Sequence, residues 1–464
     1  MQEINKKERN KNIRVRFAPA PTGKMHLGNV RTALENYLFA KKHNGTSVLR
    51  IEDTDSDRNF DPGAKEIIAT LNWLGLTFDE GPYFQSERTA IYQEKLIELE
   101  KKNLIYRCFC TSEELEEKKQ RQIALKKPPR YDRTCRKLSQ EKIQKNIDEK
   151  KPFIWRFKMN PDKSIEFKDL ARGILHFELT HFTDFPITRQ NGTFTFIFAN
   201  AIDDMSMDIT YVLRGDDHLT NTVNQVAIYQ TFKAEIPTFW HLPILCNKDG
   251  KKLSKRDFGF SLEDLKGAGY LPQALVNYLG IIGGSVKDEI MTLDELIQAL
   301  PEHPNSTSHI KYDVEKLNWV NHKWIEKLTP KQLVTICIPF LKQTYNLDGF
   351  SEEKIMQLIT LIQSDLITLK DIIQATRFYF EKPTVSEEIN PEILEILKTN
   401  KNLLETPQEF LDKVKQTART KSIALSALFQ TIRLLLIGSK KGPNLVGLLE
   451  VLGNAESCKR LGIT

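Results

Sequence analysis

Residues 16–29 read Arg-Phe-Ala-Pro-Ala-Pro-Thr-Gly-Lys-Met-His-Leu-Gly-Asn, and they join a predicted strand at 13–17 to a predicted helix at 30–42. The strand must stop here, because proline cannot donate to a sheet ladder. Gly23 and Gly28 allow the backbone to approach a ligand closely. Free N–H groups and the helix dipole would then point at an anion, so this turn predicts a phosphate site with His26 at the helix start.

A basic segment far downstream, at 249–256, reads Asp-Gly-Lys-Lys-Leu-Ser-Lys-Arg. Either segment alone would be an ordinary loop. Together, and in this order, they resemble the two nucleotide signatures of class I aminoacyl-tRNA synthetases, at 26–29 and 252–256. The resemblance is closer still to bacterial-type glutamyl-tRNA synthetases, through 16–23, Arg-Ile-Glu-Asp-Thr-Asp at 50–55 and Arg-Gly-Asp-Asp-His at 214–218.

The reaction that this resemblance implies needs fixed positive charge. When a carboxylate attacks the α-phosphate of ATP, negative charge grows on the phosphate oxygens, so positioning and electrostatics replace a covalent nucleophile. Lysine suits the task because its flexible point charge can follow the phosphates. We therefore assign Lys255 to the phosphates and the transition state, Lys252 to an assisting role, and His26 to a phosphate oxygen from the other side.

The resemblance also implies two sets of binding residues. An acidic substrate side chain calls for a bidentate arginine, and its ammonium group calls for an anion. The glutamate set places Arg16 and Arg214 on carboxylates and Glu52 on the α-amino group, and it comprises Arg16, Ala20, Glu52, Phe196, Asn200 and Arg214. The ATP set comprises Pro19, Thr22, Gly23, His26, Gly28, Asn29, Lys252, Ser254 and Lys255.

Four positions depart from the family pattern. Asn29 stands where many members carry a second histidine, Ala20 where a serine is frequent, Phe196 where a tyrosine is common, and Asp217 where a glutamate is frequent. A lost buried hydroxyl costs about 0.5–1.5 kcal/mol for each hydrogen bond. We expect these changes to alter single contacts and to leave the substrate class unchanged.

Two consecutive acidic pairs, Asp203-Asp204 and Asp216-Asp217, could suggest a glycosidase dyad or a two-metal site. Neighbouring side chains diverge, however, so we expect these pairs to bind substrate or to cap structure.

The order of predicted elements divides the chain of 464 residues into several parts. Strand-like and helix-like patterns alternate at 13–107 and 186–250, which predicts an α/β, Rossmann-like catalytic domain with a parallel sheet. We expect an inserted subdomain at 108–185, which in the family grips the acceptor end of tRNA. The signature loop and a connecting helical domain follow at 251–310, an all-α anticodon-binding domain at 311–464, and a disordered lead-in precedes them at 1–12.

A cysteine cluster lies in the predicted insertion. Cys108 and Cys110, one residue apart, can bind a tetrahedral ion together with a ligand from a distant turn such as Cys135. Some family members supply a histidine two residues after the last cysteine, where this chain has Lys137. Tyr131 is the fourth ligand that we favour, as in the related glutamyl-queuosine enzymes. A structural Zn²⁺ site is therefore predicted, and three reduced thiols without metal are the alternative.

Composition limits the remaining possibilities. The hydrophobic share is 40%, the charged share is 28%, and the net charge is +6, which permits a polyanionic partner without requiring one. The segment 111–151 carries 13 Lys or Arg against 8 Asp or Glu. There is no apolar run of membrane-spanning length and no secretory signal at the start. We expect a cytoplasmic monomer with no membrane partner.

These observations predict a glutamate–tRNA ligase that uses ATP with Mg²⁺, L-glutamate and tRNA(Glu), and they leave tRNA(Gln) open as a second substrate. By resemblance, transfer is to the 2′-hydroxyl of the terminal adenosine, and activation needs bound tRNA. A glutamyl-queuosine tRNA(Asp) synthetase is the nearest alternative, but that family lacks the C-terminal helical domain. A glutaminyl enzyme would not need two arginines for its side chain. A non-catalytic zinc-containing RNA-binding protein is the alternative from another class.

Overall fold

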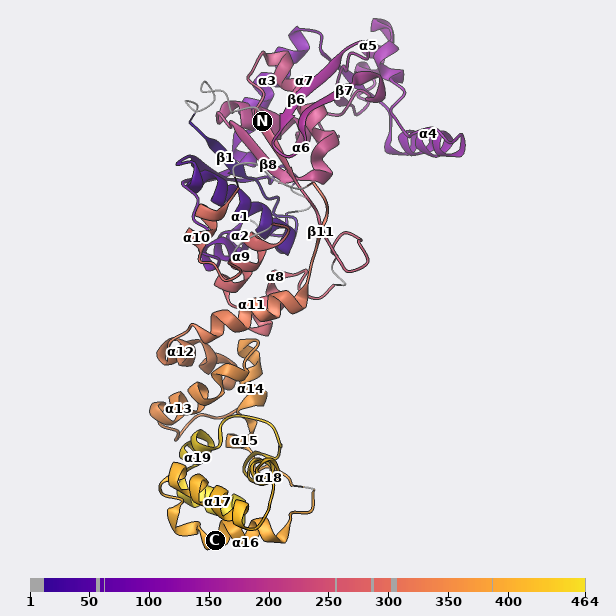
Figure 1. Ribbon diagram of the computed structural model, residues 1–464. Coiled ribbons are helices and arrows are strands. Elements are labelled where there is room, and N and C mark those ends of the chain that lie inside the picture. Colours follow the sequence, from indigo (N-terminus) through magenta and orange to yellow (C-terminus); the bar gives the residue numbers. More distant parts are fainter. Residues whose placement is uncertain are drawn as a thin grey trace. The chain divides into compact units, whose positions relative to one another are not determined.

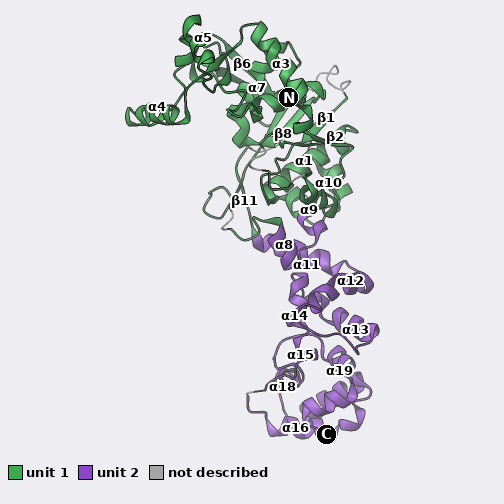
Figure 2. Cartoon of the chain, turned by 180° about the vertical axis from the view of Figure 1, so that it is seen from behind, with its two compact units in different colours: residues 1–262, 276–313 green, residues 263–275, 314–464 purple. Residues whose placement is uncertain are grey.

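A computed structural model describes residues 12–55, 59–61, 63–254, 257–284, 288–301, 307–385 and 387–463. The chain divides into two compact units, of which the first comprises 1–262 and 276–313 and the second 263–275 and 314–464 (Figure 2). The predicted lead-in at 1–12 lies outside the described residues except for Asn12.

The described strands, several of which are labelled in Figure 1, all belong to the first unit, which is green in Figure 2. They are β1 (Arg14–Phe17), β2 (Thr46–Ile51), β3 (Glu80–Phe84), β4 (Ile105–Cys108), β5 (Ile154–Phe157), β6 (Ser164–Asp169), β7 (Gly173–Glu178), β8 (Tyr211–Gly215), β9 (Thr238–Leu242), β10 (Leu245–Cys246) and β11 (Ile310–Lys311). The α-helices of this unit are α1 (Leu27–Lys42), α2 (Lys65–Trp73), α3 (Thr89–Lys101), α4 (Ser112–Ala124), α5 (Gln140–Asp148), α6 (Phe196–Ser206), α7 (Leu219–Phe232) and α10 (Leu293–Ala299). Its 3₁₀ turns are η3 (Gln85–Arg88), η4 (Thr134–Lys137), η5 (Leu179–His181) and η6 (Asp216–His218).

Two parallel sheet segments meet in the catalytic part. One has the order β1-β2-β3 and is entirely parallel, and the other has the order β7-β6-β9-β8 with β8, β9 and β6 parallel. The segments adjoin at β1 and β8, where Thr210 N–H donates to Arg14 O at 3.0 Å. The chain turns from β1 to β2 on one side of this line and from β8 to β9 on the other. Such a switch point creates a ligand crevice at the carboxyl ends of the strands.

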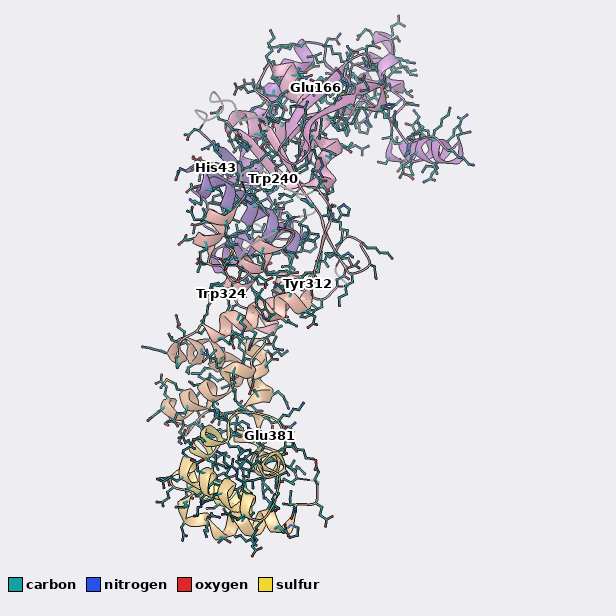
Figure 3. All side chains as sticks on the ribbon, viewed as in Figure 1. His43, Glu166, Trp240, Tyr312, Trp324 and Glu381 are labelled. Carbon is teal, nitrogen blue, oxygen red and sulfur yellow. The ribbon has the colours of Figure 1, made fainter. Side chains whose placement is uncertain are left out.

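Helix α1 is fixed to this line of strands. Asn36 Nδ2 donates to Leu213 O of β8 at 3.2 Å. Phe39 packs against Tyr211 and Trp240, with ring centroids 5.1 and 6.3 Å apart, and it also contacts His43 at the end of the helix. His43 and Trp240 are labelled in Figure 3. Helix α1 therefore packs along β8 and β9, which confirms the predicted parallel-sheet α/β architecture.

The insertion between β4 and β8 has its own small sheet. Strands β4 and β5 pair antiparallel, with Cys108 at the end of β4. Thr111 and Glu114 form a capping box at the start of α4, and Ser139 caps α5, so both helices begin where side chains satisfy their first N–H groups.

The second unit is helical in all its described regular elements. Helix α8 (Leu262–Ala268) lies mostly in this unit, and the boundary at 275/276 falls within α9 (Pro272–Ile281). The other helices are α11 (Val314–Glu326), α12 (Pro330–Leu341), α13 (Glu352–Ile362), α14 (Ile372–Ala375), α15 (Arg377–Phe380), α16 (Pro391–Thr399), α17 (Pro407–Thr420), α18 (Leu425–Ile437) and α19 (Leu445–Leu461), with 3₁₀ turns η7 (Gln363–Asp365), η8 (Leu369–Asp371) and η9 (Lys401–Leu403). Fully buried Phe410, Leu358, Ile432 and Leu448 come from α17, α13, α18 and α19, and each of the other three helices contacts α19. Nowhere in the described part of the chain does a helix combine the length and apolar character needed to cross a bilayer.

Candidate active site

A cavity of about 800 Å³ opens at the carboxyl ends of β1 and β8. It is large enough for a nucleotide and a small amino acid. The predicted residues that line it are Arg16, Pro19, Ala20, Thr22, Gly23, His26, Gly28, Asn29, Glu52, Phe196, Asn200, Arg214 and Lys252. Ser254 is not part of its lining, and Lys255 lies outside the described residues.

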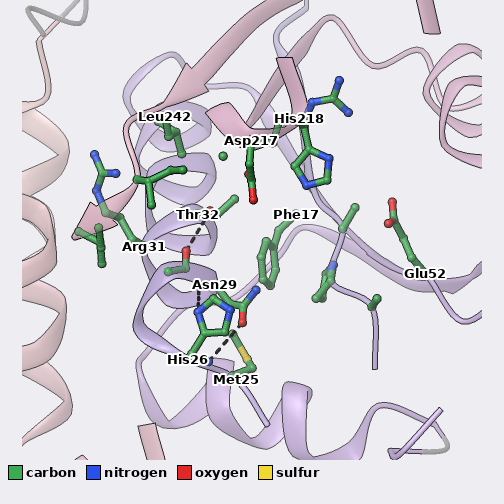
Figure 4. A pocket seen from close by; sticks show the side chains of 18 of the residues that line it. Phe17, Met25, His26, Asn29, Arg31, Thr32, Glu52, Asp217, His218 and Leu242 are labelled. Atoms are coloured by element: carbon green, nitrogen blue, oxygen red, sulfur yellow. Dashed lines mark hydrogen bonds between the residues drawn. The ribbon is translucent and has the colours of Figure 1, made fainter. Parts of the chain in front are cut away.

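His26 is the N-cap of α1. Asn29 N–H donates to His26 Nδ1 at 3.3 Å, and the backbone N–H of His26 donates to Asn29 Oδ1 at 3.2 Å (Figure 4). Burial, assisted by Lys252, lowers the pKa of His26 to about 4, so the ring is neutral at pH 7. Because Nδ1 accepts a hydrogen bond, the proton must be on Nε2, which is then a donor for an anion in the cavity.

Gly28 is required by the position of the His26 ring. A Cβ at residue 28 would lie 3.0 Å from both Cε1 and Nδ1 of His26. Any side chain there would press on the imidazole, so the glycine secures a close approach between the helix and its cap.

The basic segment returns to the start of α1. Leu27 N–H donates to Phe260 O at 3.2 Å, and Leu262 N–H donates to Met25 O at 3.3 Å. The Phe260 ring stacks on His26 with centroids 4.8 Å apart. Lys252 Nζ lies 2.8 Å from Asp217 Oδ2, and Ser254 donates to Asp257 through its N–H and hydroxyl, each at 2.9 Å. The two predicted signatures thus belong to one site, 226 residues apart at His26 and Lys252.

Arginines and carboxylates alternate beneath the glutamate set. Arg16 Nε donates to Asp204 Oδ1 at 3.1 Å, and Arg50 Nη1 donates to the same oxygen at 2.7 Å. Arg50 also lies 3.5 Å from Glu52. Burial alone would raise the pKa of Asp204, but Arg16 and Arg50 outweigh it and lower that pKa below its ordinary value. Removing one partner would leave a buried charge uncompensated, at a cost of about 3–5 kcal/mol.

The pair Asp203-Asp204 differs from the expectation that it binds substrate or caps structure. Asp203 accepts from Arg88 Nε at 2.7 Å and from Tyr92 at 2.7 Å, and neither Asp203 nor Asp204 lines the cavity. Both carboxylates bind arginines and are not part of the cavity lining. Asp217 alone among the four lines the cavity, where it pairs with Lys252.

Glu52 is a buried carboxyl group with a raised pKa. It follows β2, is 9% exposed, and accepts from Asn200 Nδ2. Burial raises the pKa of Glu52 to about 7, although Arg50 and Arg16 oppose the rise. A ligand ammonium group would favour the charged form, which suits the predicted role of Glu52 toward an α-amino group.

Two N–H groups of the Arg214 guanidinium are available to a ligand. Arg214 lies on β8, and burial, with a contribution from Arg16, lowers its pKa to about 10, so it remains a cation at pH 7. Its Nε and Nη1 atoms are buried without a hydrogen-bond partner among the described residues, and the side chain lines the cavity. A buried unpaired donor is costly, so the arrangement favours an anionic ligand.

Several lining residues were not predicted from the sequence. Arg31 donates to Pro243 O at 2.7 Å and thereby joins α1 to the segment that precedes the basic loop. His218, with a pKa lowered to about 4 by burial and by Arg214, lies 5.2 Å from the ring of Phe196. The histidine was within the quoted 214–218 block, but Arg31 had no signal because it is one arginine of an amphipathic helix. At Phe196 the aromatic ring is kept and only the hydroxyl is missing.

The three cysteines of the insertion converge. The sulfur atoms of Cys108, Cys110 and Cys135 all lie within 4.8 Å of one another. A tetrahedral zinc ion with bonds of about 2.3 Å separates its sulfur ligands by about 3.8 Å, close to the 3.5 Å between Cys110 and Cys135. The Tyr131 hydroxyl lies 3.2 Å from Cys108 Sγ and 4.0 Å from Cys110 Sγ. Three sulfurs and one phenol oxygen therefore provide four donors that fit zinc.

Comparisons with known proteins give the family. Residues 12–319 match the model for class I tRNA synthetases (E and Q), catalytic domain, and residues 332–464 match an anticodon binding domain. The chain is 38% identical to the glutamate–tRNA ligase of Bacillus subtilis (strain 168), over 97% of this chain and 99% of that protein. It is 37% identical to the glutamate–tRNA ligase of Thermodesulfovibrio yellowstonii, over 97% and 98%.

A solved structure agrees with these matches. The glutamate tRNA ligase of Elizabethkingia meningosepticum CCUG26117, crystallised in complex with its amino acid, superposes with a TM-score of 0.87 at 30% identity, covering 97% of this chain and 99% of that one. The chain therefore belongs to the glutamate–tRNA ligases, which are class I aminoacyl-tRNA synthetases.

Proposed function

We propose that the chain activates L-glutamate with ATP to glutamyl-adenylate and transfers the glutamyl group to the 3′-terminal adenosine of tRNA(Glu). The observation that carries this proposal is the meeting of His26, Lys252, Glu52 and Arg214 in one cavity. Phosphate donors and amino-acid binders must share a site for the carboxylate to attack the α-phosphate.

We propose a role for each residue of the site. His26 Nε2 donates to a phosphate oxygen, at the positive end of α1. Lys252 leaves Asp217 and turns to the phosphates, with Lys255 carrying the transition-state charge. At the other end of the cavity, Arg16 and Arg214 hold substrate carboxylates and Glu52 holds the ammonium group. The backbone of Pro19, Thr22 and Gly23 lies against the nucleotide, with Ser254 near its phosphates.

Metal ions have two proposed places. Mg²⁺ accompanies ATP and neutralises its phosphates. Zn²⁺ would be held by Cys108, Cys110, Cys135 and Tyr131, and it would supply structural rigidity to the insertion, whose proposed task is to grip the acceptor end of tRNA. Arg156 supports the ligand set, because its guanidinium lies 3.9 Å from the centre of the Tyr131 ring.

Three further points belong to the proposal. The helical domain at 311–464 would read unstacked anticodon bases, which is how most sequence-specific RNA recognition works. A glutamyl-queuosine tRNA(Asp) synthetase would lack that domain, which this chain has at 332–464. We also propose a cytoplasmic monomer, and we leave tRNA(Gln) as a second substrate to be tested.

The first experiment is aminoacylation with labelled glutamate on separate tRNA(Glu), tRNA(Gln) and tRNA(Asp) transcripts. We expect charging of tRNA(Glu). Charging of tRNA(Gln) as well would keep the chemistry and assign the broader specificity to the helical domain, to Ala20 and to Phe196. If no transcript is charged while ATP still binds, the proposal is wrong and a non-catalytic RNA-binding role replaces it.

A further inference from the structure

Arg214 is held on one nitrogen by two residues of α7. Its Nη2 atom donates to Thr222 Oγ1 at 2.7 Å and to Gln225 Oε1 at 2.6 Å. Thr222 is fully buried and Gln225 nearly so, and neither belongs to the sets predicted from the sequence. Because a guanidinium is planar and rigid, two bonds to one nitrogen restrict the direction of the other nitrogens.

The direction of the Thr222 hydroxyl is set by a buried histidine. His241 Nδ1 lies 2.7 Å from Asp169 Oδ2, which also accepts the backbone N–H of His241 at 3.1 Å. A carboxylate only accepts, so Nδ1 carries the proton. Burial lowers the pKa of His241 despite Asp169, so the ring is neutral and Nε2 is an acceptor.

Thr222 must therefore donate its one proton to His241. Its Oγ1 atom lies 2.7 Å from His241 Nε2 and 3.2 Å from the alternative acceptor, His218 O. The oxygen lone pairs of Thr222 then face Arg214, as the cation requires.

A second series of hydrogen bonds sets the direction of the Gln225 amide. Its Nε2 atom donates to Asn200 Oδ1 at 3.0 Å, and Asn200 Nδ2 donates to Glu52. When Glu52 is charged, the form that a bound ammonium group favours, its carboxylate only accepts, so Asn200 turns its oxygen to Gln225, and Gln225 turns its oxygen to Arg214. Both series of hydrogen bonds end on a carboxylate, and both present an acceptor to Nη2 of Arg214.

We propose that Thr222 and Gln225 are positioning residues for glutamate selection, which fix Arg214 so that its free Nε and Nη1 donors face the substrate carboxylate. Asp169 with His241, and Glu52 with Asn200, orient the two residues. The proposal rests on the proposed role of Arg214 as a carboxylate binder. Without these acceptors, the guanidinium would have to satisfy Nη2 elsewhere and would leave the substrate position.

The test is steady-state aminoacylation of tRNA(Glu), with KM measured separately for glutamate and for ATP. Thr222→Val keeps the shape of the side chain and removes its oxygen, and Gln225→Met removes the amide. We expect each to raise KM for glutamate about 10-fold, the effect of one hydrogen bond to a charged group, with KM for ATP within about 2-fold. Thr222→Ser should restore the wild-type KM.

Thr231→Val is the matched control. Thr231 lies on the same helix and its hydroxyl donates to Ala227 O at 2.8 Å. Among the described residues, no hydrogen bond joins Thr231 to the residues that orient Arg214. We expect its KM values to equal those of the wild type. Thermal unfolding of every variant shows whether the fold is intact, and Gln225→Met decides the matter if Thr222→Val does not fold.

The outcomes separate this proposal from the assignment of Arg214. If Arg214→Lys raises KM for glutamate but Thr222→Val and Gln225→Met leave it unchanged, Arg214 binds the carboxylate and the positioning proposal is wrong. A parallel rise in both KM values would also overturn it, because that indicates general damage. If Arg214→Lys leaves KM for glutamate unchanged, the assignment of Arg214 fails and the positioning role fails with it.

Discussion

Glu52 shows at the scale of one residue how burial and charge combine. With a pKa of about 7 it is half protonated in neutral solution, whereas its task toward an ammonium group needs the charged form. The raised pKa of Glu52 also makes the stability of the fold depend on pH. The folded state holds this proton more tightly than the unfolded chain, so the contribution of Glu52 to folding becomes less favourable as the pH rises from 4.5 toward 7.

A pH profile tests this charge state. We expect kcat/KM for glutamate to rise about tenfold per pH unit below pH 7 and to level off above it, because this parameter reports ionisation in the free enzyme. Glu52→Gln should lower the values and remove this step. A wild-type profile that is flat between pH 6 and 8 would contradict the assignment.

The lysines of the basic loop give a second prediction at this scale. Lys255→Ala should lower ATP–pyrophosphate exchange, measured with tRNA present, by more than about 100-fold, since one transition-state donor is worth that much. Lys251→Ala is the control, because this neighbouring lysine is exposed and has no assigned role. An undiminished rate in the Lys255 variant would remove that residue from the mechanism.

Sequence reasoning reached residues that line the cavity but not the residues that hold them in place. Arg16, Glu52 and Lys252 lie in compact motifs, so their spacing carries a signal. Arg214 was found in the same way, but its supports come from residues 169, 222, 225 and 241. Those contacts form only where β6, β9 and α7 come together in the fold, and no local sequence pattern encodes them.

At the scale of elements, α1 begins earlier than its pattern predicts. The apolar spacing predicts a helix over 30–42, whereas the structure begins it at Leu27. Glycine and asparagine have low helix propensity and favour a turn in a prediction. The capping box between His26 and Asn29 compensates, because it satisfies the first N–H groups of the helix.

His26 has two tasks at this helix start, and they can be separated. His26→Ala should cost about 1 kcal/mol of stability through loss of the cap and should also impair ATP–pyrophosphate exchange. His26→Asn should recover the unfolding temperature, because asparagine is a good N-cap, while exchange stays low without the Nε2 donor. Thermal unfolding and exchange assays on both variants provide the check. Recovery of exchange by asparagine would mean that His26 only caps the helix.

The cysteine cluster joins the end of β4 to η4, and we predict that zinc bound there stabilises the fold. We expect about one zinc per chain in protein purified without chelator, and a lower unfolding temperature after chelation or in Cys135→Ser, because metal binding energy is folding energy. Cys337→Ser, a buried cysteine in α12, is the control for zinc content. Less than about 0.2 zinc per chain would indicate three ordinary thiols.

At the scale of the whole molecule, the two compact units have separate cores. The sequence predicted an α/β part and an all-α part from the change in periodicity. It grouped 251–310 as the signature loop and a connecting helical domain, whereas 263–275 belongs to the helical unit and 276–313 to the first unit, because a helical pattern does not show which unit a helix joins.

Separate cores predict separate unfolding. Phe410 is fully buried in α17, so Phe410→Ala should destabilise the second unit by about 3–5 kcal/mol. Calorimetry should then show one transition moved to lower temperature and one unchanged, with ATP binding retained. Lys413→Ala, an exposed position on the same helix, should leave both transitions in place. A single transition that moves as a whole would show that the two units unfold cooperatively.

Asp169, at the end of β6, belongs to the inserted segment that is proposed to hold the tRNA acceptor end. Its carboxylate is the first member of an unbroken path through His241 and Thr222 to Arg214. Any displacement of β6 would therefore reach the guanidinium of Arg214 through these hydrogen bonds. Thermodynamic linkage is reciprocal. If bound tRNA changes the affinity for glutamate by some factor, bound glutamate must change the affinity for tRNA by the same factor.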